Sequence, residues 1–258
     1  MIKYFTFLLV VGFILIYTSC GKNDDKENGT NNNNDKNIPN CGTVTDIDGN
    51  TYNTVLIGNQ CWMRENLKTT KLNDGTAISH LSNTNDWAAN DQPASIAVSA
   101  YSWYNNDYNN YGRIYGALYN LTAIRTEKLC PQGWHVPDSY DWVEMFQSLS
   151  SQGHSYPHSV TPLKVAKALA DNTRWQKSKA LGAVGNNLSV NNISGFTALP
   201  GGYRNSNGSF SHEGKCIKYW INQQGFQELC IIAFNENTPL MKFLHNNSGA
   251  YVRCVKSN

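Results

Sequence analysis

The sequence predicts an α+β domain, in which strands and helices occupy separate stretches of the chain. Short β-rich runs bounded by turn residues lie towards both ends, within residues 43–63 and 196–256. Two stretches with helical periodicity lie between them, at 138–153 and 161–169. Strands and helices do not alternate one by one, as they would in a parallel sheet with helical crossovers.

The first predicted element is a β-hairpin. Residues 43–45 and 51–57 are β-rich, and Asp48-Gly49-Asn50 lies between them. An Asp-Gly pair between two such runs is a strong hairpin signal. Gly58-Asn59 then turns the chain again into residues 60–63. We expect this hairpin to form an N-terminal extension of the domain.

Helical signals appear only after a long stretch that is predicted to be loop-rich, residues 64–129. Aromatic and amide residues gather within it at 101–119. The first clear helix follows Pro137, where Asp138 or Ser139 can act as the N-cap. Its apolar residues recur at helical spacing on one face, at Trp142, Val143, Phe146 and Leu149.

A second helix is predicted to begin at Thr161-Pro162, because proline suits the first helical position, and to run through Leu169. After this helix the pattern returns to short strands. These are predicted at residues 196–199, 216–222, 229–234 and 251–256.

Composition excludes several classes of protein. The chain has 258 residues, 12% of them aromatic and 16% charged, which is the opposite of a disordered composition. Its 21 Lys and Arg residues against 19 Asp and Glu are scattered, so no basic stripe indicates a nucleic-acid partner. A polytopic membrane protein would need several apolar runs of about 20 residues. The sequence does not have such runs. The class that remains is a globular protein whose surface polarity comes from amides and hydroxyls rather than from charges, and which is rich in aromatic residues.

The first residues have the pattern of an export signal, predicted to span residues 1–19. Lys3 supplies a positive charge and residues 5–16 form an apolar run that is short for a membrane span. Tyr17-Thr18-Ser19-Cys20 resembles a bacterial lipobox, in which Cys20 is the lipidated residue. The alternative is a plain secretory signal with an incidental cysteine.

Residues 20–40 are predicted to be a flexible tether to a single domain, residues 41–258. The tether consists mainly of Asn, Asp, Lys and Gly, which cannot bury enough surface to offset their ordering entropy. An acidic cluster at residues 24–27 resembles the surface-export signal of Bacteroidetes lipoproteins, although a merely charged linker explains it equally. We therefore expect an outer-membrane lipoprotein, held by its lipid and exposed at the cell surface.

The remaining cysteines predict a disulfide framework, since their number is even and the chain is exported. None of them has the C-x-x-C spacing of zinc or thioredoxin-type redox sites. The pairing that we favour is Cys41–Cys61, Cys130–Cys254 and Cys216–Cys230. The alternative is that some of these residues are buried free thiols.

Several long motifs resemble the Fibrobacter succinogenes major paralogous (FISUMP) domain. They lie at residues 46–52, 55–67, 111–115, 129–137, 195–204, 208–210 and 252–255. The second half of that family is similar to the C-type lectin-like fold, which formylglycine-generating enzymes and the variable proteins of diversity-generating retroelements share. The resemblance implies two helices on a small twisted antiparallel sheet, pairing of the N- and C-terminal strands, and an irregular loop region that carries a ligand surface.

Within this fold the sequence favours a binding module over an enzyme. Aromatic and amide residues that can contact an extracellular glycan or protein gather after residue 202. The candidate ligand-binding residues are Tyr203, Arg204, Asn205, Tyr219, Trp220, Asn222, Asn235 and His245. Two other interpretations stay open, namely that these are ordinary solvated loop residues and, for Trp220, that it is a core residue.

Other chemistries lack the residues they need. Lectin-type calcium binding would require Glu-Pro-Asn and Trp-Asn-Asp motifs, but only Tyr219-Trp220-Ile221-Asn222 is present. Formylglycine-type oxidation would require a cysteine pair in a different motif, and His135 is interpreted as structural. We therefore predict no catalytic activity, no metal and no cofactor. A structural or adhesin-type surface protein without a soluble ligand is the alternative function.

Overall fold

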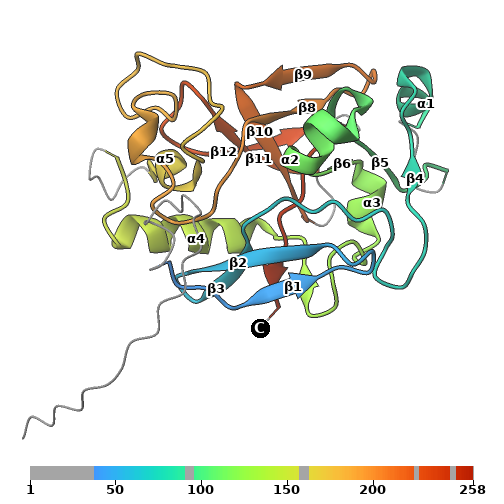
Figure 1. Cartoon of the computed structure of the whole chain (residues 1–258), viewed down its shortest axis with the longest axis horizontal. Helices are drawn as coiled ribbons and strands as arrows, with labels where there is room; N and C mark the ends of the chain where they lie inside the picture. Colours follow the sequence, from blue (N-terminus) through green and yellow to red (C-terminus); the bar gives the residue numbers. More distant parts are fainter. Residues whose placement is uncertain (1–37, 91–95, 157–162, 224–226, 245–247, 258) are drawn as a thin grey trace, which may run out of the picture. The chain divides into compact units, whose positions relative to one another are not determined.

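In the part of the chain that the structure describes, two five-stranded sheets and one three-stranded sheet form the framework (Figure 1). The structure, a computed structural model, describes residues 38–90, 96–156, 163–223, 227–244 and 248–257. More of the described residues lie in strands than in helices, and the fold is α+β as predicted. In the described part of the chain, no helix has the length and apolar character needed to span a membrane.

The first sheet joins the two ends of the domain. Its strands run in the order β1-β2-β3-β13-β7. Their bounds are Thr43–Thr45 for β1, Thr51–Ile57 for β2, Gln60–Met63 for β3, Val255–Lys256 for β13 and Trp134–His135 for β7. Val255 of β13 pairs with Trp62 of β3 in antiparallel register. The N- and C-terminal strands therefore pair, as the family resemblance implies.

The predicted hairpin is present between β1 and β2. The Asp46 carboxylate accepts hydrogen bonds from the backbone N–H groups of Asp48 and Asn50, at 3.0 and 2.9 Å. Gly49 has a φ of 84°, a conformation that glycine adopts without a steric penalty. The Tyr52 hydroxyl donates to the same carboxylate at 2.6 Å. Asp46 thus organises a hairpin turn, as expected from its Asx-type position.

The main helix, α4, spans Ser139–Ser151 and confirms the prediction made from its periodicity. Asp138 is the N-cap and forms a reciprocal capping box with Asp141. Gly153 follows the helix with a φ of 80°. The buried face of the helix consists of Trp142, Met145, Phe146, Leu149 and Ser150.

The second sheet has the strand order β12-β11-β10-β8-β9. The bounds are Gly201–Arg204 for β8, Phe210–Glu213 for β9, Cys216–Ile221 for β10, Gln227–Ala233 for β11 and Leu240–Leu244 for β12. β10 and β11 confirm two predicted strands, whereas β8, β9 and β12 were not predicted. β8 and β10 are parallel and meet at Gly202 and Ile217, while the other pairs are antiparallel.

Helix α4 lies between the two sheets (Figure 1), and its aromatic side chains pack into the core that the sheets share. The ring centroid of Trp142 lies 5.0 Å from that of Trp62 in β3 and 5.6 Å from that of Tyr219 in β10. Phe196 completes this aromatic cluster, 5.9 Å from Trp142. Large aromatic side chains dominate the burial energy here, since each removes about 150–250 Å² from water. This core holds the second sheet in a defined position relative to the first.

The region predicted to be loop-rich contains several very short elements. The three-stranded sheet consists of β4 at Ser79–His80, β5 at Ala100–Ser102 and β6 at Leu118–Tyr119. The helices are α1 at Thr84–Ala89, α2 at Arg113–Tyr115 and α3 at Leu121–Arg125, with helical turns at Tyr104–Asn106 and Tyr108–Gly112. Elements of two to six residues are too short to show a hydrophobic period, so the sequence did not predict them.

The structure corrects three predicted elements. Helix α5 spans only Ala166–Leu169. It ends at Leu169 as predicted, where Ala170 leaves the helix and pairs with Ala198, but it begins later than predicted, because Val165 has non-helical backbone angles (φ −101°, ψ 5°). Thr161-Pro162 lies outside the described residues. The strand expected at 196–199 is absent among these residues, since Thr197 has a φ of 56°, which no regular strand accommodates. The strand expected at 251–256 is reduced to β13.

The predicted tether is shorter at its C-terminal side than expected. Pro39 accepts a backbone hydrogen bond from Leu56 at 2.8 Å, and Ile38 packs against the core. Residues 38–40 therefore belong to the domain. The predicted signal, Cys20 and the rest of the tether lie outside the described residues.

Candidate functional site

Two of the three predicted disulfides are confirmed. Cys41 is bonded to Cys61, and Cys130 to Cys254. The first ties the start of the domain to β3, and the second ties the loop before β7 to the segment before β13. Both disulfides therefore connect segments that lie in or next to the strands of the first sheet.

The third predicted disulfide is wrong, because Cys216 and Cys230 are buried free thiols. In the register of β10 and β11, Cys216 lies opposite Ala233, and Cys230 lies opposite Tyr219. Cys216 and Tyr219 are three residues apart on one strand, so their side chains point to opposite faces of the sheet. The two thiols therefore lie on opposite faces and cannot meet.

Three of the predicted ligand-binding residues are structural. Arg204, Tyr219 and Trp220 each have 0% of their surface exposed. Tyr219 is part of the aromatic core, and Trp220 donates from Nε1 to the backbone carbonyl of Tyr119 at 2.7 Å. The prediction of ligand contact is corrected for all three, since none reaches the surface.

Arg204 is buried because the fold supplies hydrogen-bond partners for its guanidinium. Its guanidinium donates to the backbone carbonyls of Gly208, Leu81, Ser82 and Asn83. It also lies 4.4 Å from the ring centroid of Trp87 in α1. Burial lowers the pKa of this guanidinium to about 10, so it remains charged at neutral pH. Arg204 thus fastens the segment before α1 to strand β8.

Replacing Arg204 with Met is expected to release the segment around β4 and α1 while the main core stays folded. The four carbonyls lose their shared donor, and each unsatisfied buried group costs about 1–3 kcal/mol. Native-state hydrogen exchange should be faster in the variant than in the wild type at residues 79–90, and should change little in α4. Uniform acceleration across both regions would contradict this local role.

The other predicted residues are dispersed. Asn205 is half-buried in the turn between β8 and β9, where its amide donates to Ser209 and Ser211. Asn222 follows the far end of β10 and donates from its backbone N–H to the Pro137 carbonyl at 2.9 Å. His245 lies outside the described residues. Only Tyr203 and Asn235 come together.

Tyr203 and Asn235 line a cleft of about 210 Å³, here called the outer-sheet cleft. The cleft lies over β8, β10 and β11, on the sheet face that points away from α4. Its lining residues are Tyr203, His212, Lys215, Cys216, Lys218, Ile231, Ala233, Phe234 and Asn235. It therefore combines aromatic rings, an amide and two cations on an apolar floor.

A stack of side chains forms one wall of this cleft. The rings of Tyr203 and His212 are stacked, with their centroids 5.3 Å apart and their planes 18° apart. The Lys218 ammonium lies 3.2 Å from the centroid of the Tyr203 ring. His212 is exposed, and Tyr203 and Lys218 are half-buried. The wall thus presents an imidazole face and a cation to solvent.

The backbone conformation of β8 determines the positions of Tyr203 and His212 in this wall. Gly202 has a φ of 70°, and a Cβ atom there would lie 2.4 Å from the carbonyl oxygen of Ser211. Only glycine allows β8 and β9 to approach this closely. Gly202, which lies in the family motif at residues 195–204, therefore places Tyr203 beside His212.

Burial changes the ionisation of the cleft residues. It lowers the pKa of Lys218, and the nearby charge of Lys242 lowers it further. It raises the pKa of the Cys216 thiol to about 11, so this thiol is protonated and unreactive at neutral pH. The thiol on the cleft floor is therefore not a thiolate at neutral pH.

Sequence reasoning missed the two lysines of the cleft. The alternation along β10 could have identified Lys218, because Cys216 and Lys218 share one face while Ile217 and Tyr219 share the other. Lys215 lies in the turn before β10, and no local signal points to it. Its place in the cleft follows only from the fold.

A second cleft, of about 290 Å³, collects residues from several family motifs. It is lined by Asn53, Arg64, Glu65, Asn66, Ile114, Asp171, Thr197, Leu199 and Arg253. Its carboxylates already have partners in the fold. Glu65 accepts from the backbone and side chain of Asn53, both at 2.8 Å, and Asp171 accepts from the backbone of Thr173 at 2.8 Å. These contacts indicate a structural junction.

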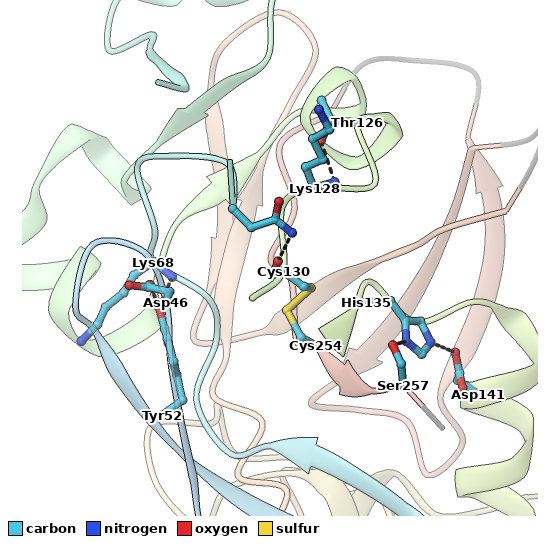
Figure 2. The surroundings of a disulfide bond; sticks show 11 residues. Asp46, Tyr52, Lys68, Thr126, Lys128, Cys130, His135, Asp141, Cys254 and Ser257 are labelled. Atoms are coloured by element: carbon cyan, nitrogen blue, oxygen red, sulfur yellow. Dashed lines mark hydrogen bonds and ion pairs between the residues drawn. A yellow bond between two sulfur atoms is a disulfide. The ribbon is translucent and has the colours of Figure 1, made fainter. Parts of the chain in front are cut away.

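A Ser–His–Asp line lies near the Cys130–Cys254 disulfide (Figure 2). His135 contacts Ser257 through Nδ1 and Asp141 through Nε2, at 3.0 Å each. A serine hydrolase uses these nitrogens in the opposite order. Asp141 also closes the capping box of α4, and Ser257 lines neither of the two clefts. We therefore interpret His135 as a link between α4 and the C-terminal strand.

Fold and clefts together define a disulfide-bonded α+β domain with a small polar and aromatic cleft on one sheet. The chain belongs to the Fibrobacter succinogenes major domain family, whose model matches residues 55–256. This match confirms the family resemblance of the motifs. No curated protein and no solved structure matches the chain.

Proposed function

We propose that this protein is a non-catalytic lipoprotein of the cell envelope that binds an extracellular glycan in its outer-sheet cleft. The observation that carries the proposal is the stacked Tyr203–His212 pair beside Asn235. Exposed aromatic faces pack on the apolar faces of sugar rings, and amides supply hydrogen bonds to hydroxyl groups. The cleft offers both within about 210 Å³.

The proposal includes a C-type lectin-like arrangement of the domain. Three features support it: the pairing of β13 with β3, the packing of α4 and α5 into one core, and the many short elements between residues 64 and 129. In such an arrangement an irregular loop region carries the ligand surface, and Lys215, Phe234 and Asn235 of the outer-sheet cleft lie in turns that border the second sheet. The outer-sheet cleft lies on this sheet.

The proposal also includes attachment to the outer membrane through a lipid on Cys20, with the domain exposed at the cell surface. The lipobox-like Tyr17-Thr18-Ser19-Cys20 and the polar stretch that follows support it. Metabolic labelling with a palmitate analogue should mark the wild-type chain but not the Cys20→Ala variant. Protease treatment of intact cells should remove the domain if it faces outward.

Binding can be tested on a glycan array with the full chain in detergent. The double variant Tyr203→Ala/Asn235→Ala is expected to lose binding about tenfold or more, because both residues line the cleft. The matched control is Asn205→Ala/Asn222→Ala, which removes two other predicted residues that lie outside the cleft. Unchanged binding by the first double variant would exclude this site.

A protein ligand or a purely structural role in the envelope is the alternative. The exposed hydrophobic side chains outside the cleft, such as Leu181 at 81% exposure, are the observation that favours it. Under this alternative, neighbouring envelope proteins should copurify with the full chain and no array glycan should bind.

A further inference from the structure

We infer that the outer-sheet cleft selects acidic glycans, in which a sugar ring carries a carboxylate or a sulfate. The inference rests on the proposed function and specifies its ligand class. The charges that line the cleft carry it, together with the lack, among the residues that the structure describes, of a carboxylate paired with Lys218.

The charged residues that line the cleft are cationic. Lys215 and Lys218 line it, together with the imidazole of His212, and no lining residue is acidic. The adjacent Glu213 is not a lining residue, and it accepts a hydrogen bond from the Tyr115 hydroxyl at 2.7 Å. An anion that enters the cleft therefore meets cations without a competing carboxylate.

Lys218 is the residue for which a bound anion would act as the counter-ion. Its side chain is half-buried on β10, and its ammonium contacts the Tyr203 ring. No carboxylate of the described residues pairs with it, and Lys242 on β12 adds further positive charge. Removing an ammonium from water without a counter-ion is unfavourable. A bound anionic group would offset this cost, because an ammonium–carboxylate hydrogen bond is stronger than a neutral one.

The remaining lining residues explain why the anion would belong to a sugar. His212 offers an exposed ring face, and Asn235 offers an exposed amide. Free inorganic anions would leave both unused, whereas a uronic acid or a sulfated sugar would occupy cation, ring and amide together. Selection therefore comes from the combination of groups and not from charge alone.

The experiment compares polymers that differ in charge. The full chain in detergent is titrated with polygalacturonate and dextran sulfate, and with their neutral counterparts, methyl-esterified polygalacturonate and dextran. About 0.15 M salt keeps long-range attraction small, since the Debye length is then about 8 Å. Lys218→Met is compared with Lys256→Met, which removes the same charge from an exposed position on β13.

We expect at least one acidic polymer to bind, and we expect Lys218→Met to weaken it about tenfold or more while Lys256→Met has little effect. If only carboxylated or only sulfated polymer binds, the acidic group is identified. Equal weakening by the two lysine variants would overturn the inference. Should Lys218→Met not fold, the exposed Lys215→Met carries the same comparison.

Binding to neutral polymers as strong as to acidic ones would overturn the inference but leave the proposed function standing. Binding to none of the four polymers would also overturn it, and the glycan array then decides the proposed function separately.

Discussion

Replacing both Cys130 and Cys254 with alanine is expected to lower the free energy of unfolding by about 5 kcal/mol. The two residues are 124 positions apart, so the disulfide restricts a loop that contains α4 and all of the second sheet. In the chain-entropy model a longer loop gives a larger restriction of the unfolded chain. Urea denaturation of the oxidised wild type and the variant measures the difference.

The Cys41–Cys61 disulfide provides the matched control. Its residues are only 20 positions apart, so its removal is expected to cost about 3 kcal/mol. Cys216→Ala, which affects a free thiol, should cost less than either. A larger loss from the short loop than from the long one would contradict the entropic explanation.

Arg253→Met is expected to destabilise the protein by about 3–5 kcal/mol. The Arg253 side chain is 1% exposed and donates to the Asn66 side chain, the Phe196 carbonyl and the Tyr219 hydroxyl. Its guanidinium also lies 4.4 Å from the Phe196 ring centroid. Methionine fills much of the space but leaves these acceptors without a donor in the core. The midpoint of urea unfolding measures the loss.

Two further variants separate the causes of this loss. Arg253→Lys keeps the charge but not the planar fork, so we expect it to recover little of the stability. Arg113→Met removes an exposed arginine that lies 5.5 Å from the Tyr108 ring, and should cost less than about 1 kcal/mol. A mild effect of Arg253→Met, comparable to that of Arg113→Met, would show that water replaces the buried guanidinium.

Local signals in the sequence predicted the elements that depend on neighbouring residues. The hairpin at Asp48-Gly49 and the helix after Asp138 both follow from turn and capping chemistry within a few residues. Where long-range contacts decide the backbone, prediction from sequence failed. Thr197 adopts a positive φ while its hydroxyl donates to the Arg64 carbonyl, 133 residues away in the chain.

The candidate site shows the same division. Composition pointed to aromatic and amide recognition, and Tyr203 and Asn235 do line the outer-sheet cleft. Arg204, Tyr219 and Trp220 looked equally suitable in the sequence, yet all three are buried. A polar side chain in a strand can face solvent or fill the core, and only the packing partners of that strand decide which. For Arg204 these partners are the carbonyls of residues 81–83.

The sequence by itself determined the family, the α+β class, the first hairpin and the main helix, because family motifs are long and specific and because turns and caps depend on neighbouring residues. It predicted two disulfides correctly and a third wrongly. The tertiary structure alone decided that Cys216 and Cys230 lie on opposite sheet faces, and that Lys215 and Lys218 meet Tyr203 and Asn235 in one cleft. The physical reason is that strand register and sheet order bring together residues whose separation in sequence carries no trace of their contact.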